Sequence, residues 1–250
     1  MNFVRVPRHT LSRGLQPRPI ATSNPYLRQF GRNFSTTTIA MAATPQRHFQ
    51  RPAVFVCDMQ EKFRGAIWQF DKILLTAQKV LRAAQILQVP VFVTTQNAAR
   101  LGGTVSELEP LTAGAQVSAD KTAFSMMRVP ELAARFPPAA QRPEEEQGSS
   151  EVAIVGIESH ICVTQTALDL LARGHRVYVL ADGVSSCNAE EVPLALARLR
   201  AAGAVVTTSE GWLYECMGDA GIAEFRDVAK LVKETSAQSK GVLSSLLSKI

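Results

Sequence analysis

Short apolar segments alternate with longer amphipathic segments from residue 52 to residue 234. In the segment 72–88, Ile73, Val80 and Leu87 recur at helical spacing and share one face. The apolar segments are rich in β-branched residues and have the length of strands. We expect strands at 52–58, 89–96, 115–120, 151–157, 175–183 and 204–210, and helices at 72–88, 129–136, 161–173, 189–203 and 222–234.

This alternation predicts one α/β domain, with a six-stranded parallel sheet covered by helices on both faces. The fold class is a three-layer α/β/α sandwich with the sheet order 3-2-1-4-5-6, a common order of doubly wound sheets. No apolar stretch reaches the length of about 18 residues that a transmembrane helix needs. The segment 137–150 mixes Pro, Gly, Ser and acidic residues, and we interpret it as a solvated loop because the alternation resumes after it.

The first 50 residues contain seven arginines and no acidic residue. Without them, 20 of the 27 basic residues remain against 22 acidic ones, so the net charge of +5 belongs to this segment and does not indicate a nucleic-acid partner. An acid-free start rich in Arg, Ser and Thr is typical of a mitochondrial transit peptide, and "GRNFSTTT" resembles the context in which presequences are cut. We expect residues 1–48 to be a disordered leader directing the chain to the mitochondrial matrix; the alternative is a disordered basic tail.

Two further features concern location and boundaries. Met41 offers an internal start, and the terminal Ser248-Lys249-Ile250 is similar to the Ser-Lys-Leu peroxisomal signal, so a cytosolic or peroxisomal form is an alternative. We expect the folded domain to span residues 49–235 and the Ser- and Lys-rich segment 236–250 to be a flexible tail.

No motif indicates a cofactor or a metal. Neither G-x-G-x-x-G nor G-x-x-x-x-G-K occurs, so a nucleotide-binding function has no support. The cysteines form no C-x-x-C pair and lack zinc-like spacing, and we expect free thiols; they are Cys57, Cys162, Cys187 and Cys216.

Polar residues follow the carboxyl ends of the expected strands, where open α/β sheets bind their ligands. They are Asp58, Gln96, Asp120, Lys121, Glu158, Ser159, Cys162 and Asp182. Cys162 is the strongest candidate for chemistry. With Ser159 as N-cap it is the third residue of a helix, where free N–H groups and the helix dipole stabilise a thiolate and an oxyanion. The alternative is a small buried residue, which is the usual situation of a cysteine.

A nucleophilic thiol usually needs a base. His160 lies about 200° round the helix axis from Cys162, and His175 begins a strand at the opposite end of the sheet. Asp58 is the better candidate, because it ends the first strand, which neighbours the fourth, and Lys121 can orient it. Taken singly, Asp58 is equally well explained as a turn residue and Lys121 as a surface lysine.

Several motifs together resemble the isochorismatase-like cysteine hydrolases. They are "VFVCDMQEKFR" (54–64), "DKTAFSM" (120–126) and "VGIESHICVTQTALDLLARGHRVYVLADGVSS" (155–186). The segments "TTQNAARLGGTVSEL" (94–108) and "TSEGWLYECMGDA" (208–220) are more similar still to the isochorismatase domain-containing protein 2 subgroup, and the likeness runs from about Pro52 to Lys233. The resemblance implies a six-stranded α/β/α sandwich that often assembles into homo-oligomers.

The resemblance also implies a catalytic triad, which falls on Asp58, Lys121 and Cys162. In this triad the cysteine attacks an amide or related carbonyl to form a thioester, which water then hydrolyses. A cis peptide bond shortly before the cysteine, here between Ile157 and Glu158, helps to aim oxyanion-hole amides near Glu158 and Cys162.

Two departures from the family pattern narrow the reaction. True isochorismatases cleave a vinyl ether and lack the nucleophilic cysteine, so that reaction is not expected here. Nicotinamidases hold a metal through an Asp and two His after the second strand. In that region this chain reads "TTQNAARLGG", which contains neither His nor Asp, so a metal-assisted nicotinamidase is not expected. In that segment Gln96 is either a hydrogen-bond partner of a substrate or a solvated loop residue, while Phe63 and Trp68 either wall the pocket or simply pack.

We therefore expect a metal-independent cysteine hydrolase that acts on a small amide, ureido or related C–N substrate. We expect no cofactor and no nucleic-acid or membrane partner. The alternative is a non-catalytic member of the same fold that binds a ligand or a protein partner, which would not need Asp58, Lys121 and Cys162 together. No motif encodes the identity of the substrate.

Overall fold

The computed structural model describes residues 46–141 and 148–247. Residues 1–45 of the expected leader, Met41 among them, and the terminal Ser248-Lys249-Ile250 lie outside these ranges, so the predictions made for them stay predictions. The expectation that the disordered leader extends to residue 48 was wrong, because the backbone N–H of His48 donates a 3.3 Å hydrogen bond to the Met217 carbonyl and Arg47 forms an ion pair with Glu224. In the part of the chain that is described, no helix is both long and apolar enough to cross a membrane.

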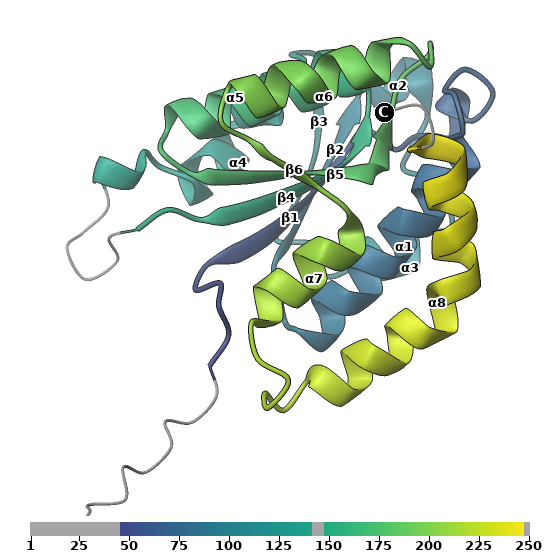
Figure 1. The fold of residues 1–250 in the computed structure, drawn as a ribbon. Coiled ribbons are helices and arrows are strands. Elements are labelled where there is room, and N and C mark those ends of the chain that lie inside the picture. Colours follow the sequence, from purple (N-terminus) through teal and green to yellow (C-terminus); the bar gives the residue numbers. More distant parts are fainter. Residues whose placement is uncertain (1–45, 142–147, 248–250) are drawn as a thin grey trace, which may run out of the picture. The chain divides into compact units, whose positions relative to one another are not determined.

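The centre of the fold is a six-stranded sheet in which every pair of neighbours is parallel. The strands are β1 (Pro52–Cys57), β2 (Val91–Gln96), β3 (Val117–Lys121), β4 (Glu151–Ile157), β5 (Arg176–Ser185) and β6 (Val205–Thr207). Their order is β3-β2-β1-β4-β5-β6, which confirms the predicted topology (Figure 1). The central pair is therefore β1 and β4, and their carboxyl ends lie side by side.

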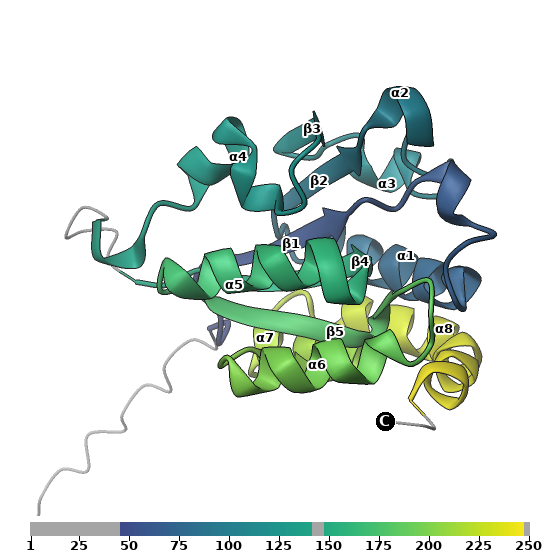
Figure 2. The same ribbon diagram turned by 90° about the horizontal axis from the view of Figure 1, so that it is seen from above.

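Helices cover both faces of this sheet, as the three-layer prediction requires (Figures 1 and 2). One face carries α1 (Phe70–Ile86), α7 (Ser209–Met217) and α8 (Phe225–Leu246). The other face carries α4 (Pro130–Arg135), α5 (Thr164–Ala172) and α6 (Glu191–Ala201). Two short helices, α2 (Ala98–Leu101) and α3 (Glu109–Thr112), lie between β2 and β3 in the sequence.

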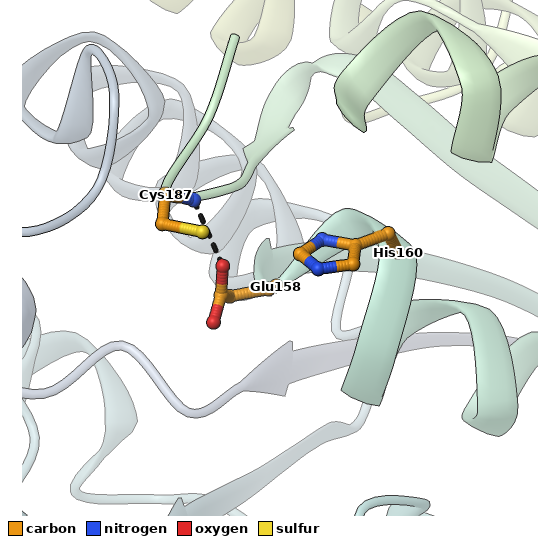
Figure 3. A group of neighbouring side chains, drawn as sticks. All are labelled: Glu158, His160 and Cys187. Carbon is orange, nitrogen blue, oxygen red and sulfur yellow. Dashed lines mark hydrogen bonds between the residues drawn. The ribbon is translucent and has the colours of Figure 1, made fainter. Parts of the chain in front are cut away.

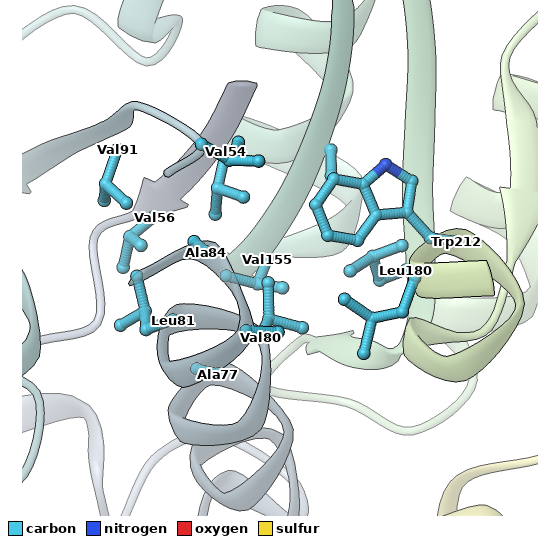
Figure 4. Packing of buried hydrophobic residues seen from close by; sticks show 14 of the residues in the cluster. Val54, Val56, Ala77, Val80, Leu81, Ala84, Val91, Val155, Leu180 and Trp212 are labelled. Atoms are coloured by element: carbon cyan, nitrogen blue, oxygen red, sulfur yellow. The ribbon is translucent and has the colours of Figure 1, made fainter. Parts of the chain in front are cut away.

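Helix α1 packs its apolar face onto the middle of the sheet (Figure 4). Ala77, Val80, Leu81 and Ala84 recur at i, i+3, i+4 and i+7, which places them on one stripe of the helix. They are at most 1% exposed and meet strand residues that include Val54, Val56 and Val155.

The prediction of a flexible tail over residues 236–250 was wrong for residues 236–246. Helix α8 continues to Leu246, and Val242 and Leu246 are 1% and 2% exposed. These two residues extend the stripe of Val228, Leu231 and Thr235 at spacings of three, four and seven, a pattern that the Ser and Lys residues between them obscure. Burial of each of the two side chains contributes about 1.5–3 kcal/mol, which holds the last turns of α8 against the domain.

The last strand is shorter than predicted, and the helix after it was not predicted. Residues 204–210 were expected to form a strand, but β6 ends at Thr207. The Thr208 side chain caps α7 by accepting a 3.1 Å hydrogen bond from the backbone N–H of Gly211. Ser209 donates from its backbone N–H and its hydroxyl to Asp182 on β5, at 2.7 and 2.6 Å, so Asp182 anchors α7.

Candidate active site

Three strands bring the predicted catalytic residues to one edge of the sheet. Asp58 directly follows β1, Lys121 is the last residue of β3, and Cys162 lies five residues after the end of β4. Asp58 takes a left-handed φ of 53°, which turns the chain sharply at the end of the strand. The structure places the side chains of Asp58, Lys121 and Cys162 together below the protein surface.

A buried ion pair forms the centre of this group. Lys121 Nζ lies 2.7 Å from Asp58 Oδ2, and the two side chains are only 3% and 2% exposed. Thr94 donates a 2.8 Å hydrogen bond to the other carboxylate oxygen, Asp58 Oδ1. Lys121 Nζ also lies 3.9 Å from Cys162 Sγ. The ammonium group therefore touches both the candidate base and the candidate nucleophile.

The surroundings of Lys121 decide its charge. Burial by itself lowers the pKa of this lysine, but the acidic groups around the ammonium, Asp58 among them, outweigh burial and raise the pKa above its ordinary value. Lys121 is consequently protonated at neutral pH. A charged lysine in a nearly closed site stabilises negative charge on any atom that it touches.

Cys162 sits on a π-helical turn, Ser159–Val163, that leads directly into α5. The peptide bond between Ile157 and Glu158, just before this turn, is cis, as the sequence resemblance implied. The prediction that Ser159 caps the helix was wrong, because Ser159 belongs to the turn itself. Its hydroxyl oxygen has no hydrogen-bond partner among the described residues, and the Glu158 carbonyl accepts the N–H groups of Ile161 and Val163 at 3.0 and 3.2 Å.

A second thiol, that of Cys57, borders the same group. Cys57 is fully buried, and its Sγ lies 3.7 Å from Asp58 Oδ2. Burial raises the pKa of Cys57 well above its ordinary value, and a side-chain hydrogen bond with Cys162 adds to the effect. Strand alternation could have indicated this neighbour, because Cys57 shares its face of β1 with Phe55, the face that α5 covers.

Comparison with known proteins identifies the family to which this fold and this group of residues belong. The isochorismatase domain model matches residues 52–211. The chain belongs to the isochorismatase domain family. Isochorismatase domain-containing protein 2 of Homo sapiens is 40% identical over 186 residues, which cover 74% of this chain and 85% of the human protein. Isochorismatase domain-containing protein 1 of Salmo salar is 41% identical over 192 residues, and the match covers 77% of this chain but only 64% of the salmon protein.

A solved structure shows the same isochorismatase fold. The MAR1 ribonuclease of Caenorhabditis elegans superposes with a TM-score of 0.64 at 36% identity, over 73% of this chain and 90% of the nematode chain. The family is one of hydrolases, and the six-stranded sheet of this chain is the sheet of that family.

Gln96, expected as a substrate contact, has two hydrogen-bond partners in this site, and its contact with a substrate stays a prediction. Its side-chain carbonyl accepts a 2.7 Å hydrogen bond from Lys121 Nζ, and its side-chain amide donates a 2.8 Å bond to the Thr122 carbonyl. Gln96 and Lys121 are direct partners in the register of β2 and β3. In this structure Gln96 therefore orients Lys121.

Phe63 and Trp68 precede α1 and are half-buried against the core. The backbone N–H of Trp68 donates to the Ser186 carbonyl at 2.9 Å, and the Ser185 hydroxyl donates to the Trp68 carbonyl. These bonds tie the segment before α1 to the end of β5. A role of the two rings as walls of a substrate pocket stays a prediction.

His160 and His175, the two histidines weighed as bases, have hydrogen-bond partners other than Asp58, Lys121 and Cys162. His175 is buried just before β5, at the amino end of the strand, and its Nδ1 accepts the backbone N–H of Ser150. His160 Nδ1 is 2.9 Å from the Ser186 hydroxyl, on the loop after β5. Asp120, the other acid at the end of β3, accepts the Thr95 hydroxyl and the Ala98 N–H, both at 2.9 Å, and so fixes the start of α2.

Proposed function

We propose that this chain is a metal-independent cysteine hydrolase that cleaves a small amide, ureido or related C–N bond through a thioester on Cys162. The observation that carries the proposal is the position of Lys121 Nζ, 2.7 Å from Asp58 Oδ2 and 3.9 Å from Cys162 Sγ in a nearly closed site. An ammonium that contacts both a carboxylate and a thiol brings together the groups that nucleophilic catalysis needs.

In the first half of the reaction, Cys162 Sγ attacks the carbonyl carbon while Asp58 accepts the thiol proton. Lys121 stabilises the negative charge on the sulfur and on the carboxylate. Backbone N–H groups near Glu158 and Cys162 hold the oxyanion of the tetrahedral intermediate. When that intermediate collapses, the C–N bond breaks and Asp58 returns the proton to the leaving amine, which leaves a thioester on Cys162.

In the second half, Asp58 takes a proton from a water molecule that attacks the thioester. The C–S bond breaks, Cys162 regains its proton from Asp58, and the carboxylic or carbamic acid departs. Each proton that Asp58 accepts is given back within one turnover, so the cycle consumes only substrate and water.

The closed site favours a small substrate. Cys162 is 7% exposed, and the two members of the ion pair are less exposed still. The nematode relative is described as a ribonuclease, but residues 51–250 of this chain carry 20 basic against 22 acidic residues, which gives a polyanion no general attraction. RNA therefore serves as the comparison substrate in the test.

The test is turnover of a panel of small amides, ureides and a single-stranded RNA by the full chain and by Cys162→Ala. Small C–N substrates should be hydrolysed only when Cys162 is present, and rapid quenching should trap an acyl group on Cys162, visible by mass spectrometry. Glu190→Gln, which changes an exposed side chain outside the group of Asp58, Lys121 and Cys162, is the control and should keep its activity.

Hydrolysis that survives in Cys162→Ala would overturn the proposal. Tight ligand binding without turnover would favour the alternative of a non-catalytic binding protein. Size-exclusion chromatography with light scattering checks the expected homo-oligomer. For location we propose the mitochondrial matrix, tested by imaging with a tag at each end in turn; cytosolic signal from both tagged chains would contradict it.

A further inference from the structure

Three side chains of metal-binding type gather beside the turn that carries Cys162. Glu158 and His160 come from the end of β4 and the π-helical turn, and Cys187 comes from the loop after β5. One ligand atom of each, a carboxylate oxygen, an imidazole nitrogen and the thiol sulfur, lies within 4.8 Å of the others. In Figure 3 the sulfur of Cys187 and the ring of His160 approach the Glu158 carboxylate from two sides.

The three donors form a mixed O, N and S set. Zn²⁺ accepts all three kinds of atom at about 2.0–2.3 Å, whereas Mg²⁺ and Ca²⁺ take oxygen ligands. In a tetrahedral zinc site with such bonds, neighbouring ligand atoms are about 3.3–3.8 Å apart. The ligand atoms of the three side chains lie within 4.8 Å of one another, so they must approach by about 1 Å to close on an ion.

Each of the three side chains already has a partner that orients it. The Ser186 hydroxyl lies 2.9 Å from His160 Nδ1, which leaves Nε2 for a metal. The backbone N–H of Cys187 donates a 2.8 Å hydrogen bond to Glu158 Oε2, which leaves Oε1. The Asn188 side-chain amide donates to Cys187 Sγ at 3.5 Å. Such outer hydrogen bonds are the usual support of metal ligands.

We propose that Glu158, His160 and Cys187 bind Zn²⁺, with a water molecule as fourth ligand. In this reaction the Cys187 thiol loses its proton to solvent and the thiolate sulfur bonds to the ion. The ion joins the turn that carries Cys162 to the loop after β5. It is distinct from the Asp58–Lys121–Cys162 group, and the proposed hydrolysis does not require it.

Zinc binds the thiolate form of a cysteine, so its binding displaces a proton from the thiol. The affinity for zinc should therefore rise with pH.

The test uses the full chain carrying Cys162→Ala, kept reduced by a phosphine. Co²⁺ serves as a spectroscopic substitute for zinc, and Zn²⁺ binding is measured by calorimetric titration. This background removes the other partly accessible thiol, since Cys57 and Cys216 are fully buried. Co²⁺ should produce a thiolate charge-transfer band in the near ultraviolet, and Zn²⁺ should abolish it. Calorimetry in buffers of different ionisation heat should show release of about one proton per ion.

Variants locate the site. Adding Cys187→Ala should remove the band, and adding His160→Gln or Glu158→Gln should each weaken Zn²⁺ binding by at least about tenfold. Glu190→Gln, which removes an exposed carboxylate three residues beyond Cys187, is the matched control and should bind as its parent does. A parent protein without the band, or a band that persists in Cys187→Ala, would overturn the proposal.

Discussion

Lys121 donates a 2.7 Å hydrogen bond to the side-chain carbonyl of Gln96, its direct partner on the neighbouring strand. Because the Thr122 carbonyl holds the other end of the Gln96 side chain, Gln96 fixes the direction from which Lys121 reaches Asp58. We expect Gln96→Met to lower kcat about ten- to hundredfold with little change in KM, since a hydrogen bond to a charged group contributes about 1.5–3 kcal/mol. Steady-state kinetics on the best substrate of the panel measures this split.

Gln85→Met, on the exposed face of α1, provides the matched control and should leave both constants unchanged. If Gln96→Met instead raises KM and leaves kcat unchanged, Gln96 binds the substrate directly, as its position after β2 first suggested.

Alkylation should distinguish Cys162 from the other three cysteines. Burial raises the pKa of Cys57 and raises that of Cys216 to about 12, and the hydrogen bond with Glu158 raises the pKa of Cys187. None of these three forms appreciable thiolate at mildly acidic pH, whereas Cys162 contacts the Lys121 ammonium.

Iodoacetamide at mildly acidic pH should therefore modify Cys162 first, as peptide mass spectrometry can record. Lys121→Met should slow the modification. Labelling of Cys187 at the same rate as Cys162 would argue against an activated nucleophile.

Gly156 is the position on β4 that tolerates substitution least. Its φ is +115°, and a Cβ added there would lie 2.1 Å from the Cys57 carbonyl oxygen, an impossible contact with the backbone of β1. We expect Gly156→Ala to destabilise the domain by about 3 kcal/mol or more, as urea unfolding followed by circular dichroism would show.

Gly65→Ala is the control for this substitution, because a Cβ at Gly65 meets nothing within 4 Å. It should change the free energy of unfolding by no more than about 0.5 kcal/mol. Equal effects of the two substitutions would contradict the close approach of β1 and β4 at Gly156.

Lys79 makes the stability of the domain depend on pH. This lysine of α1 is 3% exposed and donates a 3.1 Å hydrogen bond to the Ser239 hydroxyl on α8, and burial lowers its pKa. In the unfolded chain its pKa is about 10.4. The protonated form is thus disfavoured in the folded state. The resulting loss of folding free energy is greatest below the folded pKa and disappears as the pH rises to about 10.4.

Relative to Lys79→Met, the natural chain should therefore gain stability between about pH 7 and pH 10. Urea unfolding of both proteins at the two pH values measures the difference, in which other titrating groups cancel. A constant difference between the two proteins would show that Lys79 is not desolvated in the folded state.

The strand order could be predicted from the sequence, and with it the meeting of Asp58, Lys121 and Cys162, because parallel strands deliver their carboxyl ends to one edge. The hydrogen bonds among the residues at that edge could not be predicted in the same way. The sequence left Gln96 as a substrate contact or a loop residue, and its hydrogen bond to Lys121 follows from the register of β2 and β3, which the sequence does not give. Ser159 has the residue type of an N-cap, but the π-helical turn begins one residue earlier than a cap there would allow.

Contacts between segments that are far apart in the chain could not be predicted from the sequence either. The stripe that ends in Val242 and Leu246 is sparse, and only the packing of α8 against α1 shows that the helix continues. Cys187 lies 29 residues from Glu158, so no spacing rule for metal ligands connects the two. The alignment of β4 with β5 is what places them together.

Lys121 belongs to β3, which among residues 46–141 and 148–247 has a strand neighbour on one side only, and a groove of about 790 Å³ runs along it. Edge strands open locally at a lower free-energy cost than the centre of a sheet, where Asp58 and Cys162 are anchored by β1 and β4. Fraying of β3 would withdraw the ammonium while the rest of the domain stays folded. Hydrolysis should consequently cease at denaturant concentrations that leave the helical dichroism signal intact. The denaturant concentration at which activity is lost is then set by the local stability of β3 rather than by the stability of the core.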